Sequence, residues 1–280
     1  MIKKTFKSAE IVSTDEGMQY HIGLKPGDVA ENIILCGDVE RAEKVAKHFS
    51  QANKPICSRE YVTITGVYKS LPMTVMATGI GPDNTEIAFV ELSQIVKNPT
   101  LIRVGSSGAL KKGIELGDLV ISTGAVRLEN TSTAFVIEGY PAVAHHEVVI
   151  ALLEAAKKVG GRYHAGLTAT ASGFYGAQGR KVPGFLPRDP DIPAKLDNMN
   201  VSNLEMEASC LFTLANLRGV RAGAVCAIYA NRHKNEFIDS ETKKTAENAA
   251  IKTGLAAFEF LAGMDKSKGS EKFWLPSMGI

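Results

Sequence analysis

Hydrophobic residues recur along the chain at two spacings, and these spacings predict strands that alternate with helices. Short apolar or alternating runs predict strands at residues 31–38, 59–69, 71–79, 99–110, 117–129, 163–173 and 220–232. Apolar residues at helical spacing predict helices at residues 40–49, 85–97, 145–160, 203–219 and 240–263. We therefore expect an α/β fold, a three-layer α/β/α arrangement around a central mixed, largely parallel sheet.

The pattern contains no internal repeat and no linker long enough to separate domains, so residues 1–280 are predicted to form a single domain. Residues 1–18 form a polar leader and residues 264–280 a C-terminal tail. We expect the cluster Phe273, Trp274 and Leu275 in this tail to dock on its own subunit or on a neighbour, since exposed aromatic patches usually have a partner. The Pro- and Gly-rich residues 174–193 could form a lid.

Composition narrows the class of protein. Of the 280 residues, 45% are hydrophobic and 22% charged, which is enough to bury a large core. The net charge is +2 without a long basic run, so a nucleic-acid groove is not indicated. No apolar run approaches the ~20 residues that cross a bilayer and none resembles a signal peptide, which predicts a cytoplasmic protein. Four cysteines without CxxC spacing are predicted to be buried free thiols: Cys36, Cys57, Cys210 and Cys226.

Candidate ligand sites lie where predicted strands end, because helix N-termini there present unpaired N–H groups. Gly37 and Asp38 lead from a strand into a helix, and Arg41 borders the same first turn. Residues 105–108, Gly-Ser-Ser-Gly, are predicted to form a loop whose backbone can approach an anion. The P-loop ending, the third glycine of a dinucleotide fingerprint and the GxSxG elbow are all absent, which favours a small anion over a nucleoside triphosphate or NAD.

Charged residues also occur inside apolar segments. Arg103 shares a strand face with Gly105, and a buried guanidinium is costly unless an anion or a carboxylate meets it. A phosphate would do so, and a salt bridge to an internal acid would do so equally well. Glu205 and Glu207 flank Met206 and could bind vicinal sugar hydroxyls. A helix N-terminus with two acidic residues is the simpler explanation of this pair.

The order of these segments resembles the nucleoside phosphorylase family, especially its uridine branch, from residue 20 to the terminal helix. CGDVERAEKVA resembles that family's Gly-Asp-Pro-x-Arg segment, SREY its second arginine segment, ATGIGPDNTEIA its glycine-rich turn and LIRVGSSGAL its phosphate loop. FYGAQGR resembles the base-recognition motif of the uridine branch, NLEMEA the ribose motif and ANRHKNE the closing segment.

The resemblance implies a pentosyltransferase that cleaves uridine, and with it deoxyuridine or thymidine, reversibly with inorganic phosphate to give the base and the pentose 1-phosphate. The implied phosphate ligands are Gly37, Arg41, Arg103, Ser106 and, from a neighbouring subunit, Arg59. The implied ribose ligands are Glu205, Met206, Glu207 and, across the same interface, His21. The implied base ligands are Phe174, Gln178, Arg180, Tyr229 and Arg232, with Arg103, Gln178 and Arg180 as the catalytic residues.

The resemblance also implies a homo-oligomer, a dimer-based hexamer with shared active sites, and no cofactor besides the co-substrate phosphate. A monovalent cation site of relatives would involve Glu60, but Asn84 replaces a serine there, so no metal is assigned. Two further departures are Tyr229, where the uridine branch usually has an aliphatic residue, and Cys36, which replaces a proline before Gly37.

Three other functions remain open. A purine nucleoside phosphorylase of the same fold typically has an aspartate that protonates purine N7, whereas residues 230–232 read Ala-Asn-Arg. A nucleosidase would have no need for Arg41, Arg59 and Arg103, because water replaces phosphate as its nucleophile. A non-catalytic nucleoside-binding protein would be expected to lack part of the phosphate or ribose set.

Overall fold

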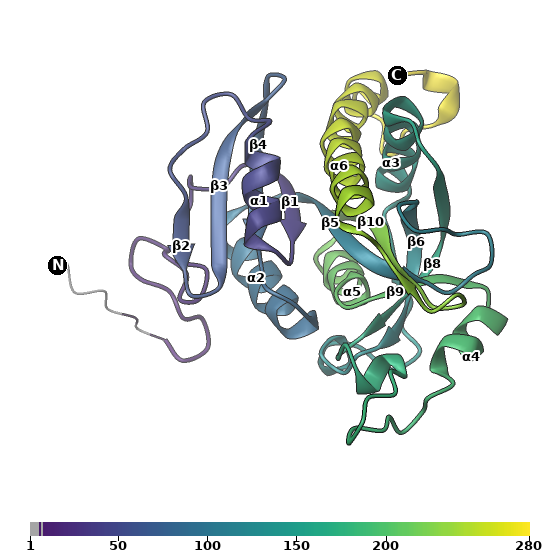
Figure 1. Cartoon of the computed structure of the whole chain (residues 1–280). Helices are drawn as coiled ribbons and strands as arrows, with labels where there is room; N and C mark the ends of the chain where they lie inside the picture. The colour runs from purple at the N-terminus through teal and green to yellow at the C-terminus, as the bar shows by residue number, and fades with distance from the viewer. Residues whose placement is uncertain (1–5, 7) are drawn as a thin grey trace.

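The computed structural model describes residues 6 and 8–280, which are built around one mixed sheet of eleven strands (Figure 1). The strands are β1 (Asn32–Cys36), β2 (Ile56–Ser58), β3 (Tyr61–Tyr68), β4 (Leu71–Ala77), β5 (Thr100–Ala109), β6 (Leu119–Leu128), β7 (Ala142–Val143), β8 (Tyr163–Ala171), β9 (Val201–Glu205), β10 (Arg221–Asn231) and β11 (Glu236–Phe237). The helices are α1 (Val39–Ala46), α2 (Pro82–Ile95), α3 (His146–Val159), α4 (Ile192–Asn198), α5 (Ala208–Arg218) and α6 (Ser240–Lys268), with single 3₁₀ turns at η1 (Ser132–Ala134), η2 (Gly176–Gln178) and η3 (Pro276–Met278).

The strand order is β11-β10-β6-β8-β9-β5-β1-β4-β3-β2, with β7 beside β6. The longest pairings, β5 with β10 and β6 with β8, are parallel, whereas β2, β3 and β4 form an antiparallel edge. Because β5 also pairs with β10, the strands β5, β10, β6, β8 and β9 close into a ring. The carboxyl ends of several strands therefore face one region.

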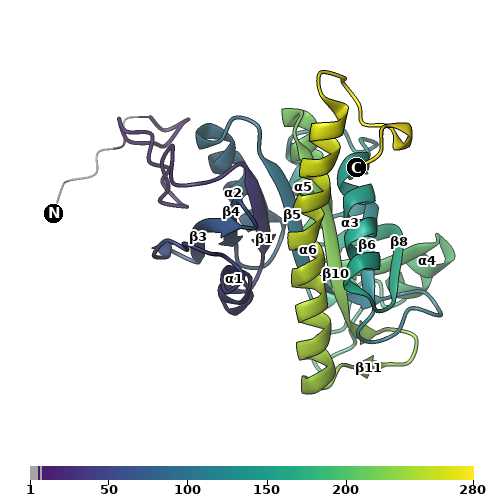
Figure 2. The same cartoon turned by 90° about the horizontal axis from the view of Figure 1, so that it is seen from above.

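Helices cover both faces of the sheet, which confirms the predicted three-layer α/β/α arrangement. One apolar core joins α1, α3 and α6 to the sheet through side chains such as Val45, Leu152 and Phe258. The core on the opposite face joins α2 and α5 through Phe89 and Phe212. In Figure 2, α3 and α6 run side by side, with α5 behind them.

Local sequence signals fix the starts of the helices that border the strand ends. The Asp38 carboxylate accepts the Glu40 N–H at 3.0 Å and caps α1 directly after β1. The Asp239 carboxylate accepts the N–H groups of Glu241 and Thr242 and caps α6 in the same way. Pro82 opens α2, where its missing N–H costs nothing.

Two predicted boundaries were wrong, and one helix was missed. Residues 105–108 are not a loop: β5 continues through them because β10 pairs with each, from Gly105 with Cys226 to Gly108 with Ala230. The predicted helix at 203–219 begins only at Ala208, because residues up to Glu205 belong to β9. The short helix α4 (Ile192–Asn198) begins at the end of the segment predicted as a loop and continues through residues for which no element was predicted.

The C-terminal tail docks on its own subunit through one of its three large apolar residues. Helix α6 runs to Lys268, and beyond it Trp274 is 5% exposed, whereas Phe273 and Leu275 are each 53% exposed. The backbone N–H of Trp274 donates to the Glu147 carboxylate of α3 at 3.0 Å. At the other end, residues 1–5 and 7 of the predicted leader lie outside the described residues.

The cysteines are free, and three of the four are buried as predicted. Cys57 is exposed, which corrects the prediction, because the edge strand β2 leaves its side chain uncovered. None of the helices in residues 6 and 8–280 is long and apolar enough to cross a membrane.

Candidate active site

A cavity of ≈ 570 Å³ lies at the carboxyl ends of β1, β5, β8, β9 and β10. Its lining contains most of the predicted site residues: Gly37, Arg41, Arg103, Ser106, Phe174, Gln178, Arg180, Glu205, Met206, Glu207 and Tyr229. The sheet topology brings them together, because the strands that carry or precede them, from β1 before Gly37 to β10 with Tyr229, have their carboxyl ends at this cavity.

Three predicted site residues are not in this lining: His21, Arg59 and Arg232. His21 and Arg59 lie close together near the N-terminal end of the chain, since Ser58 Oγ donates to the His21 carbonyl at 2.6 Å. The His21 ring lies 2.6 Å, Nδ1 to Oε1, from Glu91. Arg232 is half-buried, and its Nη1 has no hydrogen-bond partner in the part of the chain that the structure describes.

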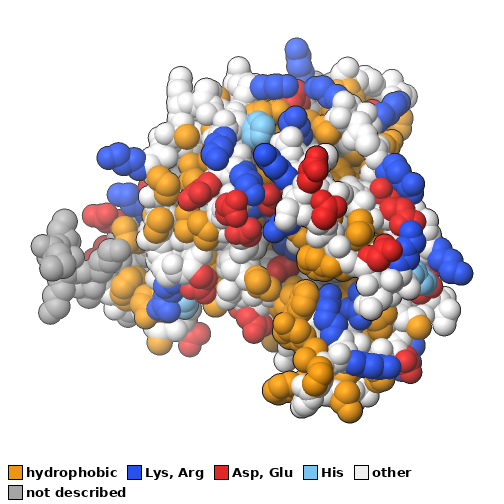
Figure 3. Space-filling view, viewed as in Figure 1, with side chains coloured by type: hydrophobic (Ala, Val, Ile, Leu, Met, Phe, Trp, Pro, Cys, Tyr) orange, Lys and Arg blue, Asp and Glu red, His pale blue; other side chains and the backbone are white. Residues whose placement is uncertain are grey.

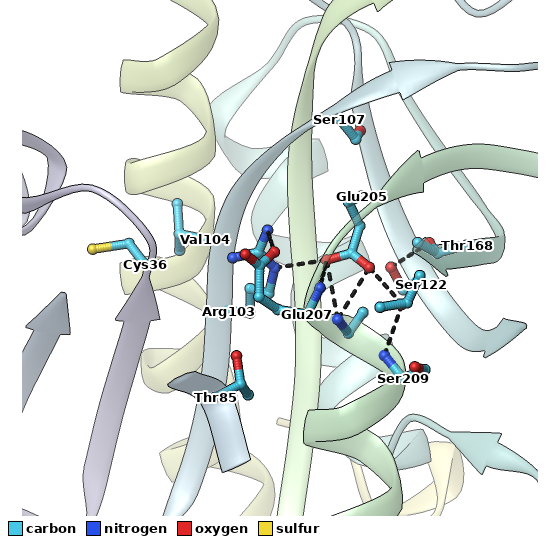
Figure 4. Close-up of polar contacts among 12 residues, drawn as sticks. Cys36, Thr85, Arg103, Val104, Ser107, Ser122, Thr168, Glu205, Glu207 and Ser209 are labelled. Carbon is cyan, nitrogen blue, oxygen red and sulfur yellow. Dashed lines mark hydrogen bonds and ion pairs between the residues drawn. The ribbon is translucent and has the colours of Figure 1, made fainter. Parts of the chain in front are cut away.

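Arg103 lies between the two glutamates of the predicted ribose motif (Figure 4). Its Nε donates to Glu205 at 2.9 Å, and its Nη2 lies 2.5 Å from Glu207. A Cβ at Gly105 would lie 2.7 Å from the Arg103 guanidinium, so the glycine keeps this space open. Internal carboxylates therefore meet the buried guanidinium, and all three charged groups also line the cavity.

Both glutamates are held from the opposite side by backbone N–H groups. Glu205 accepts the N–H of Glu207 at 2.8 Å and of Ala208 at 3.0 Å, at the start of α5. Glu207 accepts the Gly81 N–H at 2.8 Å. Burial raises the pKa of Glu207, although the neighbouring Arg103 charge works in the opposite direction. The acidic pair thus stabilises a helix N-terminus, and both residues also line the cavity.

One end of the cavity contains two buried arginines and is called the cationic end below. Arg41 and Arg103 are 6% exposed each, and both lie near the Cys36 thiol. Burial raises the pKa of that thiol to about 12, and the two arginine charges oppose the shift. Ser106 and the backbone at Gly37 complete this end, whose chemistry suits a small oxyanion.

A second group of side chains comes from the loop after β8. The Arg180 guanidinium stacks on Phe174 with 3.7 Å between its carbon and the ring centroid, and donates to the Phe174 carbonyl at 2.6 Å. It also donates to Oε1 of Gln178, which is buried on η2. Burial, and then the nearby Arg232 charge, lower the pKa of Arg180 to about 10, so the residue is charged at neutral pH.

The lining also contains residues that the sequence analysis did not assign, among them Ile80, Phe237 and Lys243. Behind it, Glu247 of α6 bonds Arg41. The signal for Glu247 was its position between Ala246 and Ala250, on the buried side of a predicted helix. A buried acid on an apolar face needs a cationic partner.

No group of three or more His, Cys, Asp or Glu residues that could hold a metal ion occurs among residues 6 and 8–280. On the face drawn in Figure 3, acidic and basic side chains are interspersed. Apolar side chains gather in the lower part of that view, over the segment after β8, where Tyr175, Phe185 and Leu186 are exposed.

Comparisons with known proteins point to one family. The family described as the phosphorylase superfamily matches residues 31–262. A uridine phosphorylase of Thermococcus kodakarensis is 47% identical over 282 residues, covering 99% of each chain. A uridine phosphorylase of Treponema pallidum is 37% identical, covering 92% of this chain and 99% of its own. The crystal structure of a uridine phosphorylase from Vibrio fischeri has a TM-score of 0.77 at 27% identity, covering 85% of this chain and 95% of its own. The chain therefore belongs to the phosphorylase superfamily, as a nucleoside phosphorylase of the uridine type.

Proposed function

We propose that this protein catalyses the reversible phosphorolysis of uridine to uracil and ribose 1-phosphate. One observation carries the proposal: a single cavity combines two buried arginines, two buried glutamates and a Gln-Arg pair on an aromatic ring. The chain that forms it is 47% identical over its length to a uridine phosphorylase. Deoxyuridine and thymidine would fit the same pocket as further substrates.

We assign phosphate to the cationic end, with Gly37, Arg41, Arg103 and Ser106 from one subunit and Arg59 from its neighbour. Guanidinium groups bind phosphate through paired N–H donors and keep their charge at every physiological pH. Phosphate attacks the anomeric carbon of ribose as the bond to the base breaks, so no protein nucleophile is required. Catalysis at this end consists of orientation and electrostatic attraction.

We assign ribose to Glu205, Met206 and Glu207, with His21 of the neighbouring subunit at the 5′-hydroxyl. Ionised carboxylates accept hydrogen bonds from sugar hydroxyls. The charges of both glutamates also partly neutralise Arg103, so this buried guanidinium has charged partners even when no phosphate is bound.

We assign uracil to Phe174, Gln178 and Arg180, with Tyr229 and Arg232 at the edges of this region. The Gln178 amide offers both a donor and an acceptor to the N3–H and carbonyl edge of uracil. As the glycosidic bond breaks, its electron pair moves onto the base, which then takes up a proton. Donors that already point at the base oxygens stabilise this developing charge more than the ground state.

We further propose a cytoplasmic homo-oligomer, a dimer-based hexamer, that needs no cofactor besides its co-substrate phosphate. The support for shared sites is that His21 and Arg59 lie together but do not line the cavity of their own subunit. In the oligomer, His21 and Arg59 would then face the cavity of a second subunit, where they would bind the ribose and the phosphate.

The decisive assay measures free base released from uridine, deoxyuridine, thymidine, cytidine, inosine and adenosine, with and without phosphate. We expect release from uridine that depends on phosphate. Release from inosine but not uridine would identify a purine enzyme, and release without phosphate a nucleosidase. Arg103→Lys should lose most of the activity, whereas Arg162→Lys, an exposed arginine outside the cavity, serves as the matched control.

A further inference from the structure

All three nitrogens of the Arg41 guanidinium are bonded within the protein. Nε donates to Glu247 at 2.9 Å, Nη1 to the Val104 carbonyl at 3.4 Å, and Nη2 to the Tyr229 hydroxyl at 3.4 Å. A guanidinium has five N–H donors. Within the described part of the chain these contacts use one N–H on each nitrogen, so one remains on Nη1 and one on Nη2. One N–H on each of the two terminal nitrogens can form a fork that binds an oxyanion through two oxygens.

Glu247 orients this fork from behind the cavity. It is 4% exposed and does not line the cavity, so it acts only through its partners. Its second oxygen accepts from Lys44 at 2.6 Å, which fixes the carboxylate from the other side. Burial alone would raise the pKa of Glu247, but its hydrogen bonds to Lys44 and Arg41 hold the pKa below the usual value. Glu247 is therefore ionised at neutral pH and bonds Arg41 as a charged acceptor.

Tyr229 fixes the other side of the fork. Its side chain is 9% exposed, lines the cavity and has two cations beside it: Arg41 at the hydroxyl, and Lys243, whose Nζ is 5.6 Å from the ring centroid. Among the contacts of residues 6 and 8–280, no hydrogen bond or ring contact joins Tyr229 to Phe174, Gln178 or Arg180. The hydroxyl therefore belongs to the cationic end of the cavity and not to the group after β8.

We propose that Glu247 and Tyr229 are positioning residues of the phosphate site, which hold Arg41 in the orientation that leaves two N–H donors for the anion. This inference rests on the proposed function only in naming the anion as phosphate. It makes α6 part of the phosphate site and assigns the Tyr229 hydroxyl to phosphate binding, not to base recognition. The ring of Tyr229 shapes the cavity wall, and the hydroxyl acts through Arg41.

The test removes one contact at a time. Tyr229→Phe keeps the ring and loses the hydroxyl, and Glu247→Gln keeps the shape and loses the charge. We expect Tyr229→Phe to raise the KM for phosphate about fivefold, as for the loss of one ordinary hydrogen bond. We expect Glu247→Gln to raise it about tenfold or more, as for one hydrogen bond to a charged group. The KM for uridine should change by less than about twofold.

Two matched controls have the same chemistry elsewhere. Tyr68→Phe removes a hydroxyl that donates to Glu259 of α6, away from the cavity. Glu40→Gln removes a carboxylate that pairs with Lys44, as Glu247 does, but does not contact Arg41. Both controls should keep the wild-type KM for phosphate.

A double-mutant cycle separates positioning from general loosening of the structure. In an Arg41→Lys background, Tyr229→Phe should have almost no further effect on the KM for phosphate, because a lysine has no fork to orient. An undiminished effect in that background would overturn the proposal. So would a Tyr229→Phe variant with altered KM for uridine, or altered preference among bases, and an unchanged KM for phosphate. If Glu247→Gln fails to fold, Tyr229→Phe alone decides.

Calorimetric titration of the free protein with inorganic phosphate keeps this test apart from the proposed function. If the wild type binds phosphate but cleaves no nucleoside, the proposed function fails, whereas the ratio of variant to wild-type phosphate affinity still decides the role of Tyr229. Equal affinities in wild type and Tyr229→Phe would overturn the inference even where uridine turnover is normal. A wild type that neither binds phosphate nor cleaves nucleosides would overturn both.

Discussion

Gly105 is the residue on which the geometry of Arg103 depends. In Gly105→Ala the new methyl group would lie 2.7 Å from Arg103 Nη2 and 3.0 Å from the Cys226 sulfur. Because the neighbouring sulfur is buried on β10, we expect the guanidinium to move, and a shift of about 1 Å at an oriented group lowers kcat/KM about 100-fold. Steady-state kinetics with uridine and phosphate measure this loss.

The control for this substitution is Gly139→Ala, where none of residues 6 and 8–280 apart from the glycine's own chain neighbours lies within 4 Å of the added methyl group. It should keep wild-type kinetics. Gly105→Ala should also unfold several degrees below the wild type, since overpacking a buried site costs about 1–3 kcal/mol. A variant with normal kcat/KM would show that the exact place of Arg103 has little importance for the reaction.

His145 predicts a pH dependence of stability. Burial, and then the neighbouring His146, lower the pKa of His145 to about 4, from an ordinary value near 6.5. Between these two pH values the unfolded chain binds a proton that the folded chain does not. The free energy of unfolding therefore has its full His145 contribution above pH 6.5, decreases as the pH falls toward 4, and changes no further below that value.

His145→Gln should remove this part of the pH dependence. Between pH 7 and pH 5 we expect the Tm of the variant to fall less than that of the wild type, by about 2 °C, measured by thermal unfolding. An equal decrease of Tm between pH 7 and pH 5 in His145→Gln and in the wild type would mean that His145 takes up a proton as readily in the folded protein as in the unfolded chain.

At the residue scale, the sequence predicted that Arg103 needs a charged partner but did not decide between a phosphate and an internal carboxylate. The choice depends on which residues come beside it, and these lie 102 and 104 positions away along the chain, at Glu205 and Glu207. Glu247 is 206 positions from Arg41 and escaped prediction for the same reason. Burial cost can be read from the local sequence, whereas the identity of the partner requires the fold.

At the scale of secondary structure elements, local periodicity predicted the long strands and helices but not the short strand β9, part of which it assigned to a helix. The Asn203 side chain donates to Ser107 at 2.9 Å and accepts from Thr168 at 2.8 Å. A buried amide needs such partners, and Asn203 finds them in a strand between β5 and β8. These contacts outweigh the helical pattern of the residues that follow.

The junction between α3 and the tail is the element-scale contact most open to test. The Glu147 carboxylate, 2% exposed, accepts from the Trp274 N–H, from Lys268 Nζ and from Arg221 Nη1. Glu147→Gln removes the buried charge that meets Lys268 and Arg221, and these two cations keep only Asp265 as a charged partner. We therefore expect a loss of about 2 kcal/mol in the free energy of unfolding and a Tm about 5 °C lower. Since Trp274 is the only tryptophan, its emission should shift to longer wavelength as the tail loosens.

Glu154→Gln provides the control on the same helix, because Glu154 is exposed. It should leave both the Tm and the emission maximum of Trp274 unchanged. A Glu147→Gln protein with a normal emission maximum would mean that apolar packing alone holds the tail on α3.

At the scale of the whole molecule, the closure of the sheet through β5 and β10 brings the predicted site together. Local patterns carry no information on this pairing, and only the family resemblance linked Gly37 with Tyr229 before the structure did. The same resemblance separated His21 and Arg59 from the rest. One chain therefore provides a cavity and, outside the lining of that cavity, the residues His21 and Arg59. The proposed function assigns these two residues to the cavity of a second subunit.

A complementation experiment decides whether cavities are shared. Arg59→Ala and Arg103→Ala should each be almost inactive, the first because it lacks the residue given to a neighbour and the second because its own cavity is damaged. In a mixed dimer of the two variants, one site would combine Arg59 of one chain with Arg103 of the other and be intact. Random reassociation should then restore roughly a quarter of the wild-type activity, since half of the dimers are mixed and each has one intact site.

The position of Arg59 is what makes this outcome informative. Its guanidinium carbon lies 4.9 Å from the Tyr20 ring centroid and is not in the lining of its own cavity, so a purely structural role would be confined to its own chain. In that case each damaged chain would stay damaged in any mixture, and no activity would return. Mixing Arg103→Ala with Glu205→Gln gives the control, because both residues line the same cavity of one chain and cannot rescue each other across an interface. Recovery in the first mixture and none in the second would require a site built from two subunits.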